Sequence, residues 1–169
     1  AIRNPASFVP SILTRLSPEH AEQVLRDTDI TALRWSDMVH RIRAEAPSVR
    51  LTLWCNEDTP LIWAEIVREL AALEHGEKIQ GGFALLSEIM SREGMARFRA
   101  YLHEHPEMTE MQKRRVIAAF LDKFAIDEEL EEELDLPGWT EEHVELLTEI
   151  YDEDVLEIQR IPGVTMIAP

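Results

Sequence analysis

AIRNPASFVPS, residues 1–11, is the stretch from which we infer the fold. Ala1 and Ile2 are apolar and lead into Arg-Asn-Pro, after which an amphipathic run begins. This order predicts the end of a buried strand, a tight turn and the start of a helix. In open α/β sheets, ligands bind at such junctions, outside the carboxyl ends of the strands. Arg3 would offer a planar fork suited to phosphate or sulfate, and a helix N-terminus beside it favours anions.

The helix that follows Pro5 has two alternative starts. Its apolar residues recur at four-residue steps, at Phe8, Ile12 and Leu16. Ser11 lies well off this stripe, so it is available to solvent or to a ligand. If the helix begins at Pro5, Pro10 lies in the helix interior, where a proline destabilises the helix by about 3 kcal/mol. If Ser7 is the N-cap, Pro10 falls in the first turn, where a missing N–H does no harm. We favour the second start, which places Ser7 and Ser11 one turn apart.

Length and composition predict an ordinary globular domain. The 169 residues suffice for one domain with a core. No apolar run approaches the length of a membrane span, and the start does not resemble a signal peptide. A single cysteine, Cys55, excludes an internal disulfide framework and is expected in the core. We expect a cytoplasmic protein. Because Ala1 enters in mid-strand, we also expect the chain to be the C-terminal part of a larger domain.

The net charge of −16 is concentrated in one segment. Between Asp122 and Glu157 there are sixteen acidic residues and one base, Lys123, whereas the rest of the chain is nearly neutral. Nucleic-acid binding requires a basic face, so this balance argues against it. It argues equally against anionic membrane surfaces.

The sequence of residues 31–75 predicts a helix, a strand and a second helix, which is the repeat of a parallel α/β sheet. The strand is VRLTLWC, residues 49–55, which alternates in polarity. Residues 76–169 are predicted to be mainly helical, with one short edge strand at 164–167. We therefore expect a helix-rich α/β fold, residues 1–169 forming a single domain with an α/β portion (1–75) and a helical portion (76–169). Helix starts are indicated at Ser17-Pro18, Thr31, Thr59-Pro60, Thr109 and Thr140.

Periodicity also predicts which helix faces are buried. The helix after Thr59 has a stripe of Ile62, Ile66, Leu70 and Leu73. The last long helix has an inner face of Val144, Leu147, Tyr151 and Ile158. Leucines at helical spacing predict a short acidic helix between Ile126 and Leu134.

Asn56-Glu57-Asp58 ends the strand at the same edge of the sheet as Arg3, if the sheet is parallel. Carboxylates there could bind a metal or act as a base. They could equally cap the helix that begins at Thr59, whose dipole favours negative charge. We favour capping. The histidines lack the spacing of a metal site, and no metal is expected.

Arg3-Asn4-Pro5 with Ser11 eight positions after the arginine resembles the segment of P-loop sulfotransferases that holds the 3′-phosphate of the donor, 3′-phosphoadenosine 5′-phosphosulfate. The strand before Glu57-Asp58 and the long helix after it also resemble bacterial sulfotransferases, as does, more faintly, the last helix near Tyr151. The resemblance implies that Arg3 and Ser11 are 3′-phosphate ligands. Ser7 is the competing ligand if the helix begins there.

The same resemblance implies transfer of a sulfuryl group to a hydroxyl or amine of a small-molecule or glycan acceptor. In that family the glycine-rich donor loop and the catalytic base precede the arginine-serine segment, so both would lie upstream of Ala1. We therefore assign no catalytic residue and expect this chain alone to be inactive. The alternative is a non-catalytic interaction module on a degenerate sulfotransferase-like fold. In that case the acidic helices between Asp127 and Glu157 would dock on a basic partner.

Overall fold

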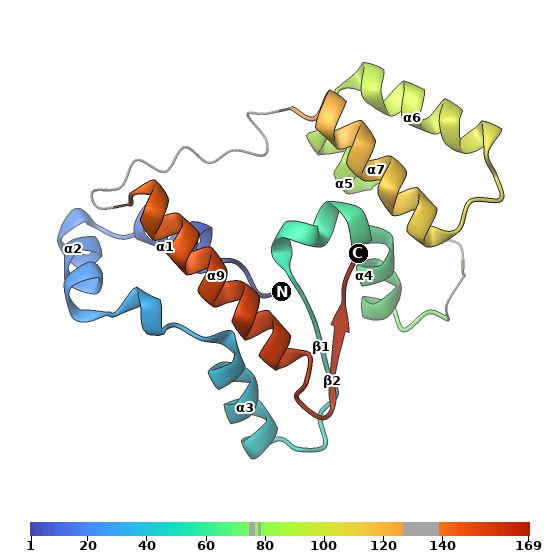
Figure 1. Ribbon diagram of the computed structural model, residues 1–169. Helices are drawn as coiled ribbons and strands as arrows, with labels where there is room; N and C mark the ends of the chain where they lie inside the picture. The colour runs from blue at the N-terminus through green and yellow to red at the C-terminus, as the bar shows by residue number, and fades with distance from the viewer. Residues whose placement is uncertain (75–76, 78, 127–138) are drawn as a thin grey trace. The chain divides into compact units, whose positions relative to one another are not determined.

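A computed structural model describes residues 1–74, 77, 79–126 and 139–169 (Figure 1). Within those residues the chain is mainly helical and has one small parallel sheet, made of β1 (Leu51–Trp54) and β2 (Val164–Ile167). This architecture is consistent with the predicted helix-rich α/β class. The acidic helix predicted between Ile126 and Leu134 lies almost entirely outside the described residues.

The described residues form two compact units that interleave along the sequence. The first unit consists of Ala1–Glu57 and the segment from Trp139 to Met166. The second consists of the described residues between Asp58 and Ile126, with Ile167–Pro169. The C-terminal helix thus belongs with the N-terminal residues, a grouping that differs from the expected portions 1–75 and 76–169. The expectation of a single domain stays a prediction.

The first unit is organised around α9 (Glu141–Ile158), which packs against α1 (Pro5–Leu13) and α3 (Trp35–Glu45). Between α1 and α3 lie α2 (Pro18–Asp27) and the short 3-10 helix η1 (Ile30–Ala32). The inner face of α9 is largely as predicted, because Leu147, Tyr151 and Ile158 are buried. Val144 is the exception and is exposed.

The sheet of the first unit places the start of the chain beside β1. Ile2 is buried and forms a parallel bridge with Cys55. The Ile2 N–H donates to the carbonyl of Trp54 at 2.9 Å, and the Asn56 N–H donates to the carbonyl of Ile2 at 2.7 Å. Ile2 and β2 therefore flank β1 (Figure 1). The sequence predicts that Arg3 follows the end of a buried strand. It follows a buried residue that pairs with the sheet, but this pairing is a single bridge at Ile2 and not a strand. β1 is also shorter than the predicted strand at 49–55.

The second unit is a helical cluster around Phe98. It contains α4 (Thr59–Leu70), α5 (Ala84–Ile89), α6 (Arg92–Glu104) and α7 (Glu110–Phe124), and α4 follows the 3-10 helix η2 (Asn56–Asp58). Ile62 and Ile66 are buried as predicted, but Leu70 is 75% exposed and Leu73 is exposed too. The predicted stripe therefore ends one turn early.

Most predicted helix starts are confirmed by their caps. Ser17 is the N-cap residue of α2, and the Thr140 hydroxyl accepts from the His143 N–H at the start of α9. Thr109 and Gln112 form the predicted capping box of α7.

Two predicted helix starts are wrong. Ser7 is not the N-cap of α1: Asn4 is, and its side-chain oxygen accepts from the Ala6 N–H at 2.9 Å. Pro10 therefore lies inside the helix. Thr31 does not open α3 either, because it lies in η1 and α3 begins at Trp35.

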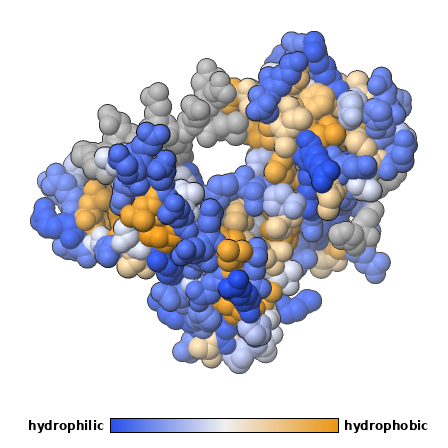
Figure 2. Space-filling model, in the orientation of Figure 1, coloured by the Kyte–Doolittle hydropathy of each residue, from blue (hydrophilic) through white to orange (hydrophobic). Residues whose placement is uncertain are grey.

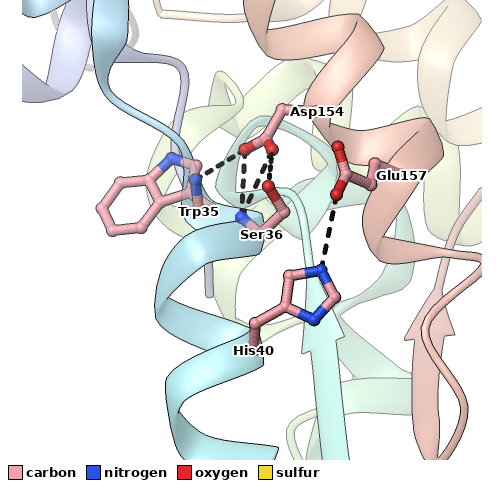
Figure 3. Close-up of polar contacts among 5 residues, drawn as sticks. All are labelled: Trp35, Ser36, His40, Asp154 and Glu157. Atoms are coloured by element: carbon pink, nitrogen blue, oxygen red, sulfur yellow. Dashed lines mark hydrogen bonds and ion pairs between the residues drawn. The ribbon is translucent and has the colours of Figure 1, made fainter.

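The start of α3 is fixed by a carboxylate from α9 rather than by a local cap. Asp154 is 3% exposed and accepts from the Trp35 N–H at 2.6 Å and from the Ser36 N–H at 3.3 Å (Figure 3). The Ser36 hydroxyl also donates to this carboxylate. The first N–H groups of a helix have no partner within the helix. Asp154 supplies that partner from 118 residues further along the chain.

Candidate anion-binding site

The backbone of Arg3 is held in place by contacts with two other parts of the first unit. Arg3 directly follows Ile2, which is anchored to β1. The carbonyl of Arg3 accepts a hydrogen bond from the indole N–H of Trp35 at 2.9 Å. The ring of Trp35 in turn makes an edge contact with Phe8, with 4.9 Å between the ring centroids. The backbone of Arg3 is thus held from β1 on one side and from α3 on the other.

The side chain of Arg3 lies along α1 and meets both predicted serines. Its Nε donates to the Ser7 hydroxyl at 3.0 Å, and its Nη1 donates to the Ser11 hydroxyl at 3.4 Å. The three residues are all half-buried. Their spacing of four residues explains the convergence, because residues four apart lie on one face of a helix. The structure thus brings both Ser7 and Ser11 to Arg3.

The two serine hydroxyls are oriented by the helix itself. Ser7 Oγ donates to the carbonyl of Asn4 at 3.2 Å, and Ser11 Oγ donates to the carbonyl of Phe8 at 2.8 Å. Each hydroxyl therefore directs its proton to the backbone and accepts from the guanidinium with a lone pair. To bind an anion, a serine must redirect its proton toward the ligand. Both hydroxyls are close enough to Arg3 for an oxyanion to contact the charge and the hydroxyls together.

The N-terminus of α1 is occupied by groups of the protein. The Asn4 N–H donates to Glu57 Oε1 at 2.7 Å, and Asn4 Nδ2 donates to Thr148 Oγ1 at 3.0 Å. Glu57 thus places a carboxylate at the end of the helix that favours negative charge. This contact uses a donor that an anion would otherwise reach. The anion-binding capacity of the site therefore depends on Arg3 and the serines rather than on the start of the helix.

Glu57 also receives the hydroxyl of Tyr151. Tyr151 OH donates to Glu57 Oε2 at 3.2 Å, and Tyr151 is 6% exposed. Burial and hydrogen bonds to Cys55 and Glu57 raise the pKa of Tyr151 well above its ordinary value, so the hydroxyl stays protonated. The expectation that Glu57 caps α4 is wrong, because its two oxygens serve Asn4 and Tyr151. Asp58 occupies the N-cap position of α4 but makes no side-chain capping bond.

The site offers a guanidinium and two hydroxyls, which are groups that could bind an oxyanion. The described residues contain no group of three or more His, Cys, Asp or Glu side chains that could hold a metal ion. Cys55 is half-buried and packs in the core beside Ile2, as expected. The tertiary partners of the site, Trp35, Thr148 and Tyr151, were not predicted, because nothing in the local sequence around them indicates a contact with residues 3–57.

Comparison of the chain with protein-family models, with curated proteins and with solved structures finds no match. Among the described helices, none combines the length and apolar character needed to cross a lipid bilayer. The function must therefore be argued from the site.

Proposed function

We propose that the protein is sulfotransferase-like and that Arg3, Ser7 and Ser11 bind the 3′-phosphate of 3′-phosphoadenosine 5′-phosphosulfate. One observation carries the proposal: the guanidinium of Arg3 meets both serine hydroxyls on one half-buried face of α1, beside the end of an extended segment. A guanidinium and two hydroxyls are donors suited to a phosphate dianion. The resemblance of residues 3–11 to the sulfotransferase segment supports the same assignment.

In this proposal the described residues position the donor rather than react with it. Sulfuryl transfer breaks the bond between sulfur and the leaving phosphate oxygen as the acceptor oxygen or nitrogen bonds to sulfur and gives up its proton to a base or to water. Holding the donor in line with the acceptor lowers the entropic part of the barrier. Charge on the leaving phosphate needs electrostatic stabilisation. Arg3 would anchor the far end of the nucleotide, and other groups would hold the reacting end.

The proposal is tested by calorimetry on the full-length protein with 3′-phosphoadenosine 5′-phosphate as the probe. Adenosine 5′-phosphate, which lacks the 3′-phosphate, should bind at least tenfold more weakly, because one charge-assisted contact contributes about 1.5–3 kcal/mol. Arg3→Ala should remove that difference. Ser7→Ala and Ser11→Ala should each reduce it by a smaller factor.

Arg15→Ala is the matched control, because Arg15 is an exposed arginine just beyond the end of the same helix. It should leave the affinity unchanged. Circular dichroism of each variant checks that the fold is retained. If both nucleotides bind equally, or if Arg3→Ala binds the 3′-phosphorylated nucleotide as well as the unmodified protein does, the assignment is wrong.

The second candidate function is a non-catalytic interaction module, and the surface of α9 favours it. Hydrophilic residues cover much of the face seen in Figure 2. The exposed charges of α9 are all acidic, at Glu141, Glu142, Glu145, Glu149, Asp152, Glu153 and Glu157. A basic partner would bind such a face with strong salt dependence. Under this alternative, an oligolysine peptide binds, Glu145→Lys with Glu149→Lys abolishes its binding, and the 3′-phosphorylated nucleotide does not bind.

A further inference from the structure

The second unit contains a pocket that is separate from the Arg3 site. Its volume is about 470 Å³, and its wall is contributed by α4, α5, α6, α7 and the turn at Gly81-Gly82. Pockets that hold small molecules begin at roughly 300 Å³. The pocket is therefore large enough for a ligand the size of a substituted aromatic ring.

Basic side chains from three different helices line this pocket. Arg68 comes from α4, Arg99 from α6 and Lys113 from α7, and the acidic residue in the wall is Glu110. The wall thus carries a net positive charge in a chain whose net charge is −16. Convergence from separate helices distinguishes it from a basic stripe along one helix, which is ordinarily a solvated face.

Arg68 and Arg99 each donate a hydrogen bond to a neutral group, and Arg68 also lies close enough to Glu110 to help lower the pKa of that carboxyl. Arg68 Nε donates to the carbonyl of Glu77 at 3.0 Å, and Arg99 Nη2 donates to the Ser87 hydroxyl at 3.4 Å. Within the described residues, neither arginine forms an ion pair. Lys113 differs, because it pairs with Glu110 at 2.8 Å and thereby lowers the pKa of that carboxyl.

The wall also contains apolar residues. It includes Ala64, Ile79 and Phe83. The turn between them is set by Gly81, whose φ of +78° suits glycine. The indole N–H of Trp63 donates to the Gly81 carbonyl at 3.1 Å and ties this turn to α4. The pocket therefore has a cationic part and an apolar part.

We propose that this pocket binds a small amphipathic anion, in which a phosphate, sulfate or carboxylate group is joined to an apolar or aromatic body. The anionic group would contact Arg68 and Arg99, whose forked donors match such oxyanions. The apolar body would lie against Phe83 and Ile79. The proposal does not rest on the Arg3 site, since every residue that it uses belongs to the second unit.

The test measures binding of phenyl phosphate to the full-length protein by calorimetry, with phenol and inorganic phosphate as partial probes. Phenyl phosphate should bind more tightly than either fragment, because only it satisfies both parts of the wall. Arg68→Gln and Arg99→Gln should each weaken it by about tenfold, the loss of one charge-assisted contact. Arg97→Gln is the matched control, because Arg97 lies on α6 close to Arg99, is exposed and pairs with Glu93. It should bind phenyl phosphate like the unmodified protein.

Three other outcomes would overturn the pocket proposal, and the first of them would assign phenyl phosphate to the Arg3 site. If Arg3→Ala abolishes phenyl phosphate binding while Arg99→Gln has no effect, the ligand occupies the Arg3 site and the pocket proposal is overturned. The pocket proposal also fails if phenyl phosphate binds no better than inorganic phosphate, or if no saturable binding occurs. Arg99 is exposed, so Arg99→Gln keeps the test meaningful even if Arg68→Gln disturbs the fold.

Discussion

The indole N–H of Trp139 donates a hydrogen bond to the carbonyl oxygen of Ala6 at 2.9 Å. In a regular α-helix this carbonyl accepts from the backbone N–H four residues later, which here belongs to residue 10. Pro10 has no N–H to donate. The side chain of Trp139 therefore replaces a missing backbone donor. This explains how α1 continues through a buried proline without leaving a buried acceptor unpaired.

Replacing Trp139 with phenylalanine should destabilise the first unit by about 1–3 kcal/mol, the cost of leaving a buried carbonyl without a donor. Phenylalanine retains much of the apolar contact that Trp139 makes with the cluster around Ala6, Val9 and Leu13. The measurement is urea unfolding followed by circular dichroism at 222 nm.

A second substitution separates the lost hydrogen bond from lost packing. In a Pro10→Ala background, residue 10 regains an N–H that can reach the Ala6 carbonyl. Trp139→Phe should then cost clearly less than it does in the unmodified protein. Equal costs in the two backgrounds would mean that the indole contributes through packing and that the hydrogen bond is unimportant.

Local signals in the sequence predict most of the helix starts, and long-range contacts explain the two that are wrong. Ser17 and the Thr109–Gln112 box are predicted correctly because each cap lies within a few residues of its helix. A start at Ser7 is favoured by the sequence because Pro10 is costly inside a helix. In the structure the indole of Trp139, 133 residues away, donates to the carbonyl that loses its backbone donor at Pro10. The start at Thr31 is wrong for the same reason, since the cap of α3 is Asp154.

In the candidate site, too, local contacts could be predicted from the sequence and long-range contacts could not. Arg3, Ser7 and Ser11 follow each other at four-residue spacing, so their proximity can be inferred once a helix is expected there. The contacts of Glu57 depend on where α9 packs, because Tyr151 meets it across 94 residues of sequence. Helix α9 is predictable from its periodicity, but its packing against α1 and α3 has no local signal. The sequence therefore predicts that Glu57 caps α4, whereas its carboxylate accepts from Asn4 at the start of α1 and from Tyr151 of α9.

Asp154→Ala should destabilise the first unit by about 1–3 kcal/mol, because it leaves the Trp35 and Ser36 N–H groups without a partner. Asp154→Asn should cost less, since its side-chain oxygen can still accept one of the two bonds. Asp152→Ala and Glu153→Ala, which change exposed neighbours, should shift stability by no more than about 0.5 kcal/mol. Urea midpoints compare the four variants. A cost for Asp154→Ala no greater than that of its neighbours would contradict the capping role.

Tyr151 should make the first unit sensitive to alkaline pH. Its pKa is raised in the folded protein by burial and by hydrogen bonds to Cys55 and Glu57, whereas in the unfolded chain it is about 10. The folded state therefore holds a proton that the unfolded chain releases. The resulting contribution is fully present below about pH 10 and falls as the pH rises above it. Tyr151→Phe should remove this part of the fall.

The measurement is the urea midpoint of each protein at several values between about pH 8 and pH 11, on both sides of the unfolded pKa. Tyr101→Phe is the matched control, because Tyr101 is 37% exposed and makes no hydrogen bond with Glu57. The unmodified protein and Tyr101→Phe should lose stability in parallel, and Tyr151→Phe should lose less. Parallel curves for all three would show that Tyr151 ionises alike in the folded and unfolded states.

Gly94→Ala should destabilise the second unit, although alanine is favoured over glycine in helices by about 1 kcal/mol. A Cβ at Gly94 would lie 2.8 Å from Phe124 Cγ and 2.9 Å from Met90 Cγ. Phe124 cannot easily retreat, because its carbonyl accepts from the Ser91 N–H at 2.8 Å. We expect overpacking to outweigh the helix preference and to cost about 1–3 kcal/mol.

Gly82→Ala provides the comparison for this last prediction, since its Cβ would meet its nearest neighbour, Ile79 Cγ1, at 3.4 Å. Gly82 also has no positive φ, so alanine causes no backbone strain there. Urea unfolding should show a small change for Gly82→Ala and a large loss for Gly94→Ala. A stabilising effect of Gly94→Ala would mean that α7 shifts away from α6. The bridge between Met90 and Ala125 opposes that shift, because it joins the residue after Phe124 to the segment that precedes α6.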